Sequence, residues 1–238
     1  MKDIKRQEEY KELGDYHKQL DKKWPYLPVF VEKFNYIDKY LTNTSKDIKI
    51  LDLGCGEGIF VEKYKRLGYN IEGLDMNYSS EYVKQGNLLS TDYPDKLFDL
   101  ILCLDVLEHL EMIDQQLAVK EINRLLKDDG KVIISVPNLA HFASRVKCMF
   151  TGKPIRTAIK AERHPGDRPI REYLSMFEKY FEVTKRKGYF PTFPIISILT
   201  WYIPSKIIWL HKIYNRVLAY PNWCFLNIIE LKKKNEKN

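Results

Sequence analysis

The spacing of apolar residues changes character near residue 46. Before that point the chain is largely polar, but four apolar residues recur at helical spacing: Phe30, Phe34, Ile37 and Leu41. They predict one apolar stripe on a helix. After it, apolar residues come in short unbroken runs that are typical of buried strands. We therefore expect an N-terminal helical extension over residues 1–45 and a single domain over residues 46–238.

Strands and helices alternate through the first part of this domain. Strand-like runs cover residues 48–53, 69–76, 82–87, 98–104 and 131–136. Helical spacing covers residues 59–68 and 115–130, and each of these segments ends at a glycine, as a helix cap would. Later helices are expected over 141–152 and 170–180, and strands over 181–190 and 223–233. The alternation predicts an α/β fold with a mostly parallel sheet.

The first strand runs directly into a glycine-rich turn. The sequence Leu51-Asp52-Leu53-Gly54-Cys55-Gly56-Glu57-Gly58 leads into the first helix. Such a turn lets a ligand lie against backbone amides at a helix N-terminus, and Asp75, at the end of the second strand, is placed to accept ribose hydroxyls. A dinucleotide fingerprint starting at Gly54 would need glycine at position 59, where the chain has Ile59. The layout alone leaves nicotinamide, S-adenosylmethionine and a purely structural turn open.

Four motifs in succession resemble those of class I S-adenosylmethionine-dependent methyltransferases. They are LDLGCGEG, the acidic Asp75, FDLILCLDVLEHL and LLKDDGKVIISVPN. The similarity is strongest to the broad branch that contains the ubiquinone-pathway O-methyltransferases, and it covers residues 46–138. It implies a Rossmann-like, seven-stranded, mostly parallel sheet with helices on both faces and a reversed last strand.

The resemblance also implies where S-adenosylmethionine binds. The expected cofactor-binding residues are Asp52, Gly54, Cys55, Gly56, Gly58, Asp75, Met76, Asn87, Leu88, Leu104 and Asp105. The three glycines would border the methionine part, Asp75 the ribose and Asn87-Leu88 the adenine. Many family members have Asp where this chain has Asn87, which puts the adenine amino contact in doubt, although an amide oxygen can still accept that bond.

A second group of polar residues follows the 98–104 strand. Asp105, Glu108 and His109 would share one face if the stretch is helical, because i, i+3 and i+4 lie side by side. Relatives of the ubiquinone-pathway type and small-RNA 2′-O-methyltransferases have Glu-x-x-Glu-His here and hold a divalent metal. We expect these three residues to be catalytic, directly or by holding Mg²⁺ or Mn²⁺. The alternative is that they only close the cofactor pocket.

The acceptor is predicted partly from missing motifs. The Asn/Asp-Pro-Pro-aromatic sequence typical of enzymes that methylate base amino groups is absent after residue 104, and so is the Pro-Cys of base-carbon methylation. Oxygen is therefore the favoured acceptor atom, ahead of an amine or carboxylate. His141 and His164 are candidate bases, because imidazole titrates near neutral pH, although a single histidine often only packs.

The net charge of +7 is unevenly distributed. Residues 1–140 carry 20 Lys+Arg and 25 Asp+Glu, whereas residues 141–238 carry 19 and 7. The expected basic loop, residues 145–171, has eight cations and only two acids; the cations are Arg145, Lys147, Lys153, Arg156, Lys160, Arg163, Arg168 and Arg171. Arginine binds phosphate and carboxylate through two hydrogen bonds, so this loop favours an anionic acceptor. A solvated basic face is the alternative.

An apolar insertion over residues 188–222 separates the last two expected strands. Residues 188–205 have no charged side chain, but Pro191, Pro194 and Pro204 interrupt them too often for a membrane-spanning helix. Aromatic and basic residues alternate further on, so residues 188–216 suit a peripheral membrane contact. A lid over the pocket and a dimer surface are the alternatives.

The four cysteines are widely spaced, and the charged N-terminus has no apolar core; both features favour a cytoplasmic protein. If residues 188–216 contact a membrane, we expect that contact at its inner face. We expect a methyltransferase that acts on a small or lipid-linked, glycan-type or isoprenoid-derived anionic molecule. The alternatives are an RNA 2′-O-methyltransferase and a non-catalytic protein that binds S-adenosylmethionine. No RNA-recognition module is evident in the sequence.

Overall fold

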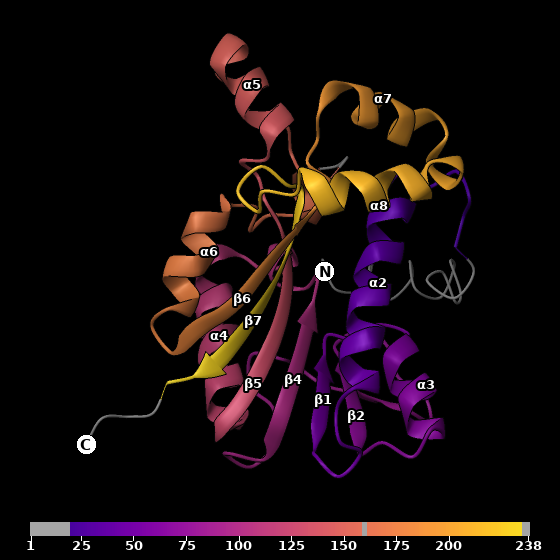
Figure 1. Ribbon diagram of the computed structural model, residues 1–238. Helices are drawn as coiled ribbons and strands as arrows, with labels where there is room; N and C mark the ends of the chain where they lie inside the picture. Colours follow the sequence, from indigo (N-terminus) through magenta and orange to yellow (C-terminus); the bar gives the residue numbers. More distant parts are fainter. Residues whose placement is uncertain (1–19, 159–160, 235–238) are drawn as a thin grey trace.

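A seven-stranded sheet forms the centre of the molecule (Figure 1). The computed structural model describes residues 20–158 and 161–234. The strands are β1 (Ile50–Leu53), β2 (Ile71–Asp75), β3 (Val83–Gln85), β4 (Phe98–Leu104), β5 (Leu126–Pro137), β6 (Phe181–Tyr189) and β7 (Leu226–Lys233). Their order is β3-β2-β1-β4-β5-β7-β6, and only β7 runs against its neighbours. The predicted Rossmann-like sheet with a reversed last strand is confirmed.

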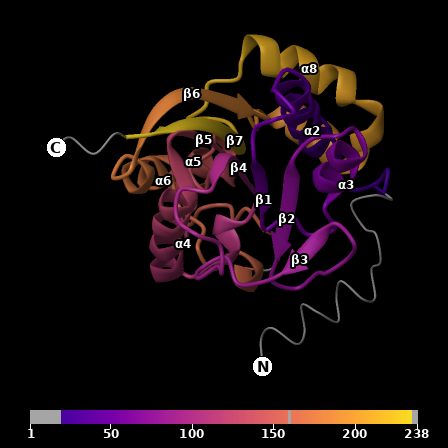
Figure 2. The ribbon, with the colours of Figure 1, turned by 90° about the horizontal axis from the view of Figure 1, so that it is seen from below.

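Helices cover both faces of this sheet (Figure 2). On one face lie α2 (Leu27–Thr42) and α3 (Ile59–Arg66), whose apolar residues pack with β1, β2 and β4; on the other lie α4 (Met112–Leu125) and α6 (Ile170–Phe177). Ile37 and Leu41 of α2 are fully buried against this core, as their helical spacing predicts. The helix expected within residues 1–45 thus belongs to the body of the fold, while residues 1–19 lie outside the described part.

Three further helices gather at the carboxyl edge of the sheet, where the parallel strands end. They are α5 (Phe142–Thr151), α7 (Pro194–Tyr202) and α8 (Ile208–Val217), with short 3-10 turns at Leu107–His109, Ala161–Arg163 and Pro204–Lys206. In Figure 1, α7 and α8 lie above the end of α2, and α5 projects from the body. None of the helices in the described residues combines the length and apolar character that crossing a bilayer requires.

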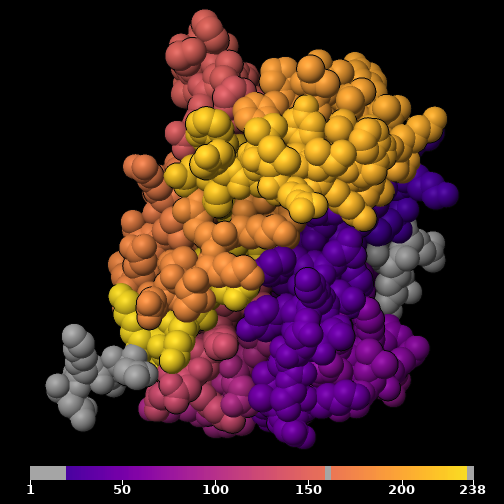
Figure 3. Space-filling view, in the orientation of Figure 1, coloured from indigo at the N-terminus to yellow at the C-terminus, as the bar shows by residue number. Residues whose placement is uncertain are grey.

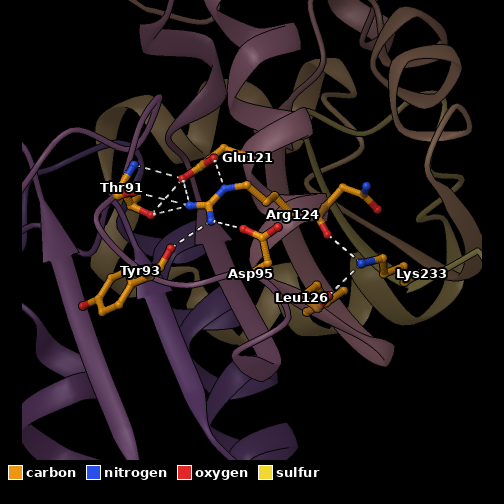
Figure 4. Close-up of polar contacts among 8 residues, drawn as sticks. Thr91, Tyr93, Asp95, Glu121, Arg124, Leu126 and Lys233 are labelled. Atoms are coloured by element: carbon orange, nitrogen blue, oxygen red, sulfur yellow. Dashed lines mark hydrogen bonds and ion pairs between the residues drawn. The ribbon is translucent and has the colours of Figure 1, made fainter.

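The helix expected over residues 115–130 ends five residues early, so that prediction is wrong at its C-terminal end. Residues 126–130 belong to β5, with Leu126 paired to Phe98 of β4. The reason is tertiary: the Lys233 ammonium of β7 donates to the carbonyls of Asn123 and Leu126, at 2.8 Å each (Figure 4). A cation at these carbonyls caps the end of α4.

A second cation fixes the same helix to the loop before β4. Arg124 of α4 forms an ion pair with Glu121 at 2.6 Å and with Asp95 at 2.5 Å, and donates to the Tyr93 carbonyl at 2.8 Å (Figure 4). Glu121 also accepts the backbone N–H of Thr91 at 2.9 Å. The connection between β3 and β4 contains no helix, and this network of polar contacts attaches it to α4 instead.

Candidate active site

The glycine turn after β1 has the conformation that its sequence predicts. Gly54, Gly56 and Gly58 all have positive φ, at 76°, 53° and 67°, and α3 begins at the next residue. A Cβ added at Gly54 would lie 2.5 Å from a methyl of Val106, and one added at Gly58 would lie 2.5 Å from a methyl of Val83. Side chains at positions 54 and 58 are therefore excluded by both backbone conformation and space.

Asp75 braces this turn from the end of β2. Its carboxylate accepts the backbone N–H of Gly56 and that of Asn77, each at 2.8 Å. The residue is 7% exposed, and burial raises the pKa of the carboxyl, while the two N–H donors pull it back down. The acid predicted for the ribose is thus in direct contact with the glycine turn; its contact with a ribose stays a prediction.

The remaining expected cofactor residues lie around this edge in different environments. Leu88 is buried, whereas Cys55, Met76 and Leu104 are half-buried. Asn87 is exposed, and its side-chain oxygen accepts the N–H of Leu89 at 2.9 Å, which leaves that oxygen's second lone pair for another donor. Burial raises the pKa of the Cys55 thiol far above its usual range, so Cys55 is no thiolate nucleophile.

A buried lysine, which the sequence analysis missed, lies among the carboxylates. Lys33 of α2 is 7% exposed and forms an ion pair with Asp105 at 2.5 Å. The Asp105 carboxylate also accepts the hydroxyls of Tyr26, at 3.0 Å, and of Ser135. The nearby ammonium and these donors hold the pKa of Asp105 below its usual value. A signal was available, because Lys33 is four residues from both Val29 and Ile37 on the buried helix face.

Asp52, at the middle of β1, is a second buried carboxyl in this region. It is 3% exposed, and burial raises its pKa to about 7, with Lys33 opposing and Asp75 adding to that rise. The carboxyl ends of β1 and β4 therefore hold a compact group of acids around one cation. Its charge state depends on pH near neutrality.

Asp105, Glu108 and His109 do not share one helical face, so that prediction is wrong, although the charge of Asp105 still acts on Glu108. The segment forms a single 3-10 turn that begins only at Leu107, and Asp105 itself has a positive φ of 55°. Its side chain is directed to Lys33, Tyr26 and Ser135 instead. Because of this positive φ, the three residues do not lie on one face of a helix.

Glu108 and His109 have a different third partner, His164 from the basic loop. Ligand atoms of the three residues all lie within 4.8 Å of one another, and the two imidazole rings pack edge to face at 4.7 Å. His164 Nδ1 lies 2.7 Å from the hydroxyl of Thr157, and that hydroxyl donates its proton to Asp167. Since a hydroxyl has one proton, it accepts from His164 Nδ1, and Nε2 is then the lone-pair nitrogen of the neutral ring.

His109 is oriented in the same way. Its Nδ1 lies 2.8 Å from the carbonyl oxygen of Arg163, so the neutral ring donates from Nδ1. Glu108 is 2% exposed, and its Oε2 has no hydrogen-bond partner among residues 20–158 and 161–234. Burial, and then the charge of Asp105, raise the pKa of Glu108 well above its usual value.

His141, the other candidate base, has a structural role in this fold. It begins α5, and its Nδ1 accepts the N–H of Ser144 at 3.4 Å. Thr192 contacts the same nitrogen at 3.0 Å. Burial lowers the pKa of His141 to about 4, so the ring is neutral at pH 7 and has little affinity for a proton. The geometry favours helix capping, and a role as base stays a prediction.

The cations of the basic loop are arranged unequally. Arg168 is 8% exposed and its guanidinium lies over the ring of Tyr173, at 5.6 Å. Lys160 lies outside the described residues. The other predicted cations of this loop are exposed: Arg145, Lys147, Lys153, Arg156, Arg163 and Arg171. In the sequence they lie on both sides of His164.

A groove in the described part of the chain lies away from these residues. Its volume is 780 Å³, and it runs between α2 and β6 toward the amino edge of the sheet. Tyr36, Lys39, Lys185 and Lys187 line it. None of the predicted site residues does, so the candidate site is defined by its side chains and not by this groove.

Comparisons with known proteins show the family and the fold of the chain. A family model described as a methyltransferase domain matches residues 22–180. The ubiquinone biosynthesis O-methyltransferase of Pelagibacter ubique is 35% identical over 106 residues, which cover 39% of this chain and 43% of that protein. An uncharacterised protein of Methanocaldococcus jannaschii is 36% identical over 98 residues, 39% and 42% of the two chains. The matches thus span less than half the length of these curated relatives.

Solved structures share the fold over most of the chain. A methyltransferase of Thermotoga maritima, described as S-adenosylmethionine-dependent and as a possible histamine N-methyltransferase, has a TM-score of 0.57 at 17% identity and covers 89% of this chain and 100% of its own. One from Archaeoglobus fulgidus has a TM-score of 0.54 at 18% identity, covering 87% and 100%. The chain belongs to the methyltransferase domain family. Its fold is that of S-adenosylmethionine-dependent methyltransferases.

Proposed function

We propose that the protein transfers the methyl group of S-adenosylmethionine to an oxygen of a small or lipid-linked anionic acceptor. The observation that carries this proposal is the bond between Asp75 and the Gly56 N–H. It joins the acid expected at the ribose to the turn expected at the methionine part, so both halves of the cofactor would meet one preformed surface. The absence of space for a Cβ at Gly54 and Gly58 fits a ligand lying against bare backbone.

The residues around this edge have separable tasks in the proposed reaction. When bound, S-adenosylmethionine supplies a methyl group on a positively charged sulfur, and that charge disappears on transfer. Catalysis then depends mainly on alignment and on removing the acceptor's proton. Glu108, His109 and His164 form a group that can hold the acceptor oxygen and take its proton. Asp105, held by Lys33 and Tyr26, keeps the turn before them in place.

The donor set of Glu108, His109 and His164 also fits a divalent metal of the kind that the family resemblance implies. One carboxylate and two imidazoles lie within 4.8 Å of one another, and both Nδ1 atoms are oriented by oxygen partners, as in metal-ligating histidines. A bound cation supplies a Lewis acid that polarises the acceptor oxygen. We propose Glu108, His109 and His164 as its ligands, with Asp105 outside the set.

Cofactor binding is tested by calorimetric titration with S-adenosylhomocysteine and, separately, with NADH. We expect binding of the first only. Asp75→Ala should weaken it by about 1.5–3 kcal/mol, the cost of removing a charged hydrogen-bonding group, whereas Asp92→Ala, at an exposed acid after β3, should leave it unchanged. Binding of NADH alone would overturn the proposal.

The acceptor is tested by transfer of a labelled methyl group to separated lipid, glycan, small-molecule and RNA fractions of a cell extract. Label in a lipid, glycan or small-molecule fraction supports the proposal, and an ester or ether linkage identifies oxygen. Label in RNA would support the 2′-O-methyltransferase alternative, because the exposed cations of the basic loop could also bind RNA phosphates. Label in no fraction would favour a protein that only binds the cofactor.

The metal site is tested by elemental analysis after dialysis against Mn²⁺ or Mg²⁺, alongside activity. We expect metal in the wild-type chain and about tenfold weaker retention in His109→Ala and His164→Ala. Glu111→Ala, at an exposed carboxylate nearby, is the matched control. Full activity after chelation, together with no retained metal, would contradict the proposed metal site. Glu108, His109 and His164 would then act only on the acceptor's proton.

A further inference from the structure

Helix α8 buries uncharged polar side chains and exposes apolar ones. His211, with no exposed surface, and Asn215, at 7%, are its buried residues. Asn215 accepts the backbone N–H of Phe190 at 2.8 Å, and His211 contacts the Thr200 hydroxyl at 2.8 Å. Apolar residues at every fourth position, Trp209, Ile213 and Val217, are exposed by 51–68%. A helix on the surface of a soluble domain has the opposite polarity.

The two neighbouring helices continue this exposed apolar surface. In α7, Ile195, Ile198, Trp201 and Tyr202 are each at least 59% exposed, while Thr200 is buried. In α5, Ser144 is the one buried residue, and Met149 and Phe150 are exposed by 74% and 78%. We call the set formed by these residues with Trp209, Ile213 and Val217 the apolar surface. Figure 3 shows these helices gathered at one end of the molecule, over the carboxyl edge of the sheet.

The charged side chains of the three helices are all positive, and the nearby acid Glu32 of α2 interacts with Lys212 and Asn215 of α8. No Asp or Glu occurs in residues 141–161 or in residues 183–229. Exposed cations nevertheless lie on the same helices or next to them: Arg145, Lys147, Lys153, Lys206, Lys212 and Arg216. Exposed tryptophan, isoleucine and phenylalanine beside such cations, on helices that contain no acid, are complementary to an anionic lipid surface.

A second copy of the chain is a poorer match for this surface. In a two-fold dimer the same patch meets itself, so the cations of the three helices would face one another, and these helices contain no acid to compensate. An anionic bilayer satisfies both requirements at once, since its acyl region takes up the apolar side chains and its headgroups pair with lysine and arginine. The helices are too short to cross a bilayer, so the contact would be peripheral.

We propose that α5, α7 and α8 dock the protein on the surface of an anionic bilayer. These helices follow β5 and β6 at the edge where the glycine turn and Glu108 also lie. Docking would therefore turn the candidate active site toward the membrane, where a lipid-linked acceptor is found. The proposal extends the proposed function, but it concerns a different surface and needs no methyl transfer to be observed.

The test is flotation of the full chain with vesicles of phosphatidylcholine alone and of phosphatidylcholine with phosphatidylglycerol. We expect flotation with the anionic vesicles that decreases from low to high salt without vanishing, because salt screens only the charge contribution. Flotation with neither type of vesicle at low salt would overturn the proposal. A dimer in light scattering that dissociates in Trp201→Ser/Trp209→Ser would also overturn it, since the apolar surface would then be a protein interface.

Two variants separate the apolar and electrostatic contributions. Trp201→Ser/Trp209→Ser should lower partitioning onto anionic vesicles by about tenfold or more, and Leu67→Ser, at an exposed leucine after α3 on the amino edge, should not lower it. Lys212→Glu/Arg216→Glu should abolish the preference for anionic over neutral vesicles. Unchanged partitioning in both double variants would overturn the assignment of the surface. Unfolding curves confirm that each variant is folded. Titration of S-adenosylhomocysteine in the same samples distinguishes a failure of membrane docking from a failure of the proposed function.

Discussion

The carboxyl edge of β1–β4 and the helix pair α7–α8 both bury polar side chains, but they do so in opposite ways. The strand edge buries ionisable acids and neutralises one of them, Asp105, with the Lys33 ammonium at 2.5 Å. The helix pair buries a neutral imidazole, His211, on the Thr200 hydroxyl and turns its apolar side chains outward.

The difference shows how a fold can keep polar groups away from water. A buried charge needs an opposite charge, so the strand edge depends on a partner from a distant helix. A buried neutral group needs only a hydrogen bond, and His211 finds one within the helix pair, from its Nε2 to Thr200. The contributions of the two regions to the free energy of unfolding should accordingly change with pH in opposite directions.

Removing the buried cation should have the largest effect. Lys33→Ala leaves Asp105 without its partner and should lower the free energy of unfolding by about 3 kcal/mol, the lower end for a buried pair, because the Asp105 side chain keeps some exposure. Lys39→Ala, at an exposed lysine of the same helix, should cost less than about 0.5 kcal/mol. Urea unfolding measures both. Equal losses would mean that the ion pair does not stabilise the strand edge.

The glycine turn should show the next largest effect, on cofactor affinity. Gly58→Ala places a Cβ 2.5 Å from Val83 at a φ of 67°, and we expect S-adenosylhomocysteine to bind on the order of 10- to 100-fold more weakly, about 1.4–2.8 kcal/mol. Gly152→Ala has the same kind of φ, 68°, with no atom within 4 Å of the new Cβ. It should leave affinity unchanged. A similar loss of S-adenosylhomocysteine affinity in both variants would mean that the packing of Gly58 against Val83 is irrelevant to binding.

The pH dependence of stability should identify Asp52. Its folded pKa of about 7 exceeds the value near 4 of an unfolded aspartate, so the folded state keeps a proton that the unfolded state has lost. Between about pH 4 and pH 7 the contribution of Asp52 to the unfolding free energy should fall by about 1.4 kcal/mol per pH unit. The difference between wild type and Asp52→Asn in urea unfolding at pH 5, 6 and 7 measures this slope. A flat difference would contradict the raised pKa.

His211 should show the opposite sign over a narrower range. Thr200 donates its hydroxyl proton to the Ile196 carbonyl at 2.5 Å and so accepts from His211 Nε2, and burial lowers the pKa of His211 to about 4. Between about pH 4 and pH 6.5 the unfolded state binds the extra proton, so stability should rise with pH by up to about 1.4 kcal/mol per unit. His211→Gln should remove this rise and leave the Asp52 slope intact. Removal of both slopes by one variant would show that the two regions are coupled.

The sequence by itself determined the parallel sheet, the glycine turn and the acid at the end of the second strand. These features depend on neighbours in the chain: a buried apolar run forms a strand, and glycines at positions 54 and 58 permit positive φ. The family motifs lie in the same segments. The reversed last strand followed from the family resemblance, and the position of Asp75 at the end of the second strand followed from the sequence pattern.

Only the tertiary structure decided which side chains meet across segments. The end of α4 at Leu125 depends on Lys233, which is more than one hundred residues away in the sequence, and the ion pair of Lys33 with Asp105 joins α2 to the end of β4. The positive φ at Asp105 interrupts the expected helical face, and folding of the basic loop places His164 beside Glu108 and His109. Periodicity encodes which face of an element is buried, but not which distant side chain neutralises a buried charge, because that depends on the packed arrangement of the whole chain.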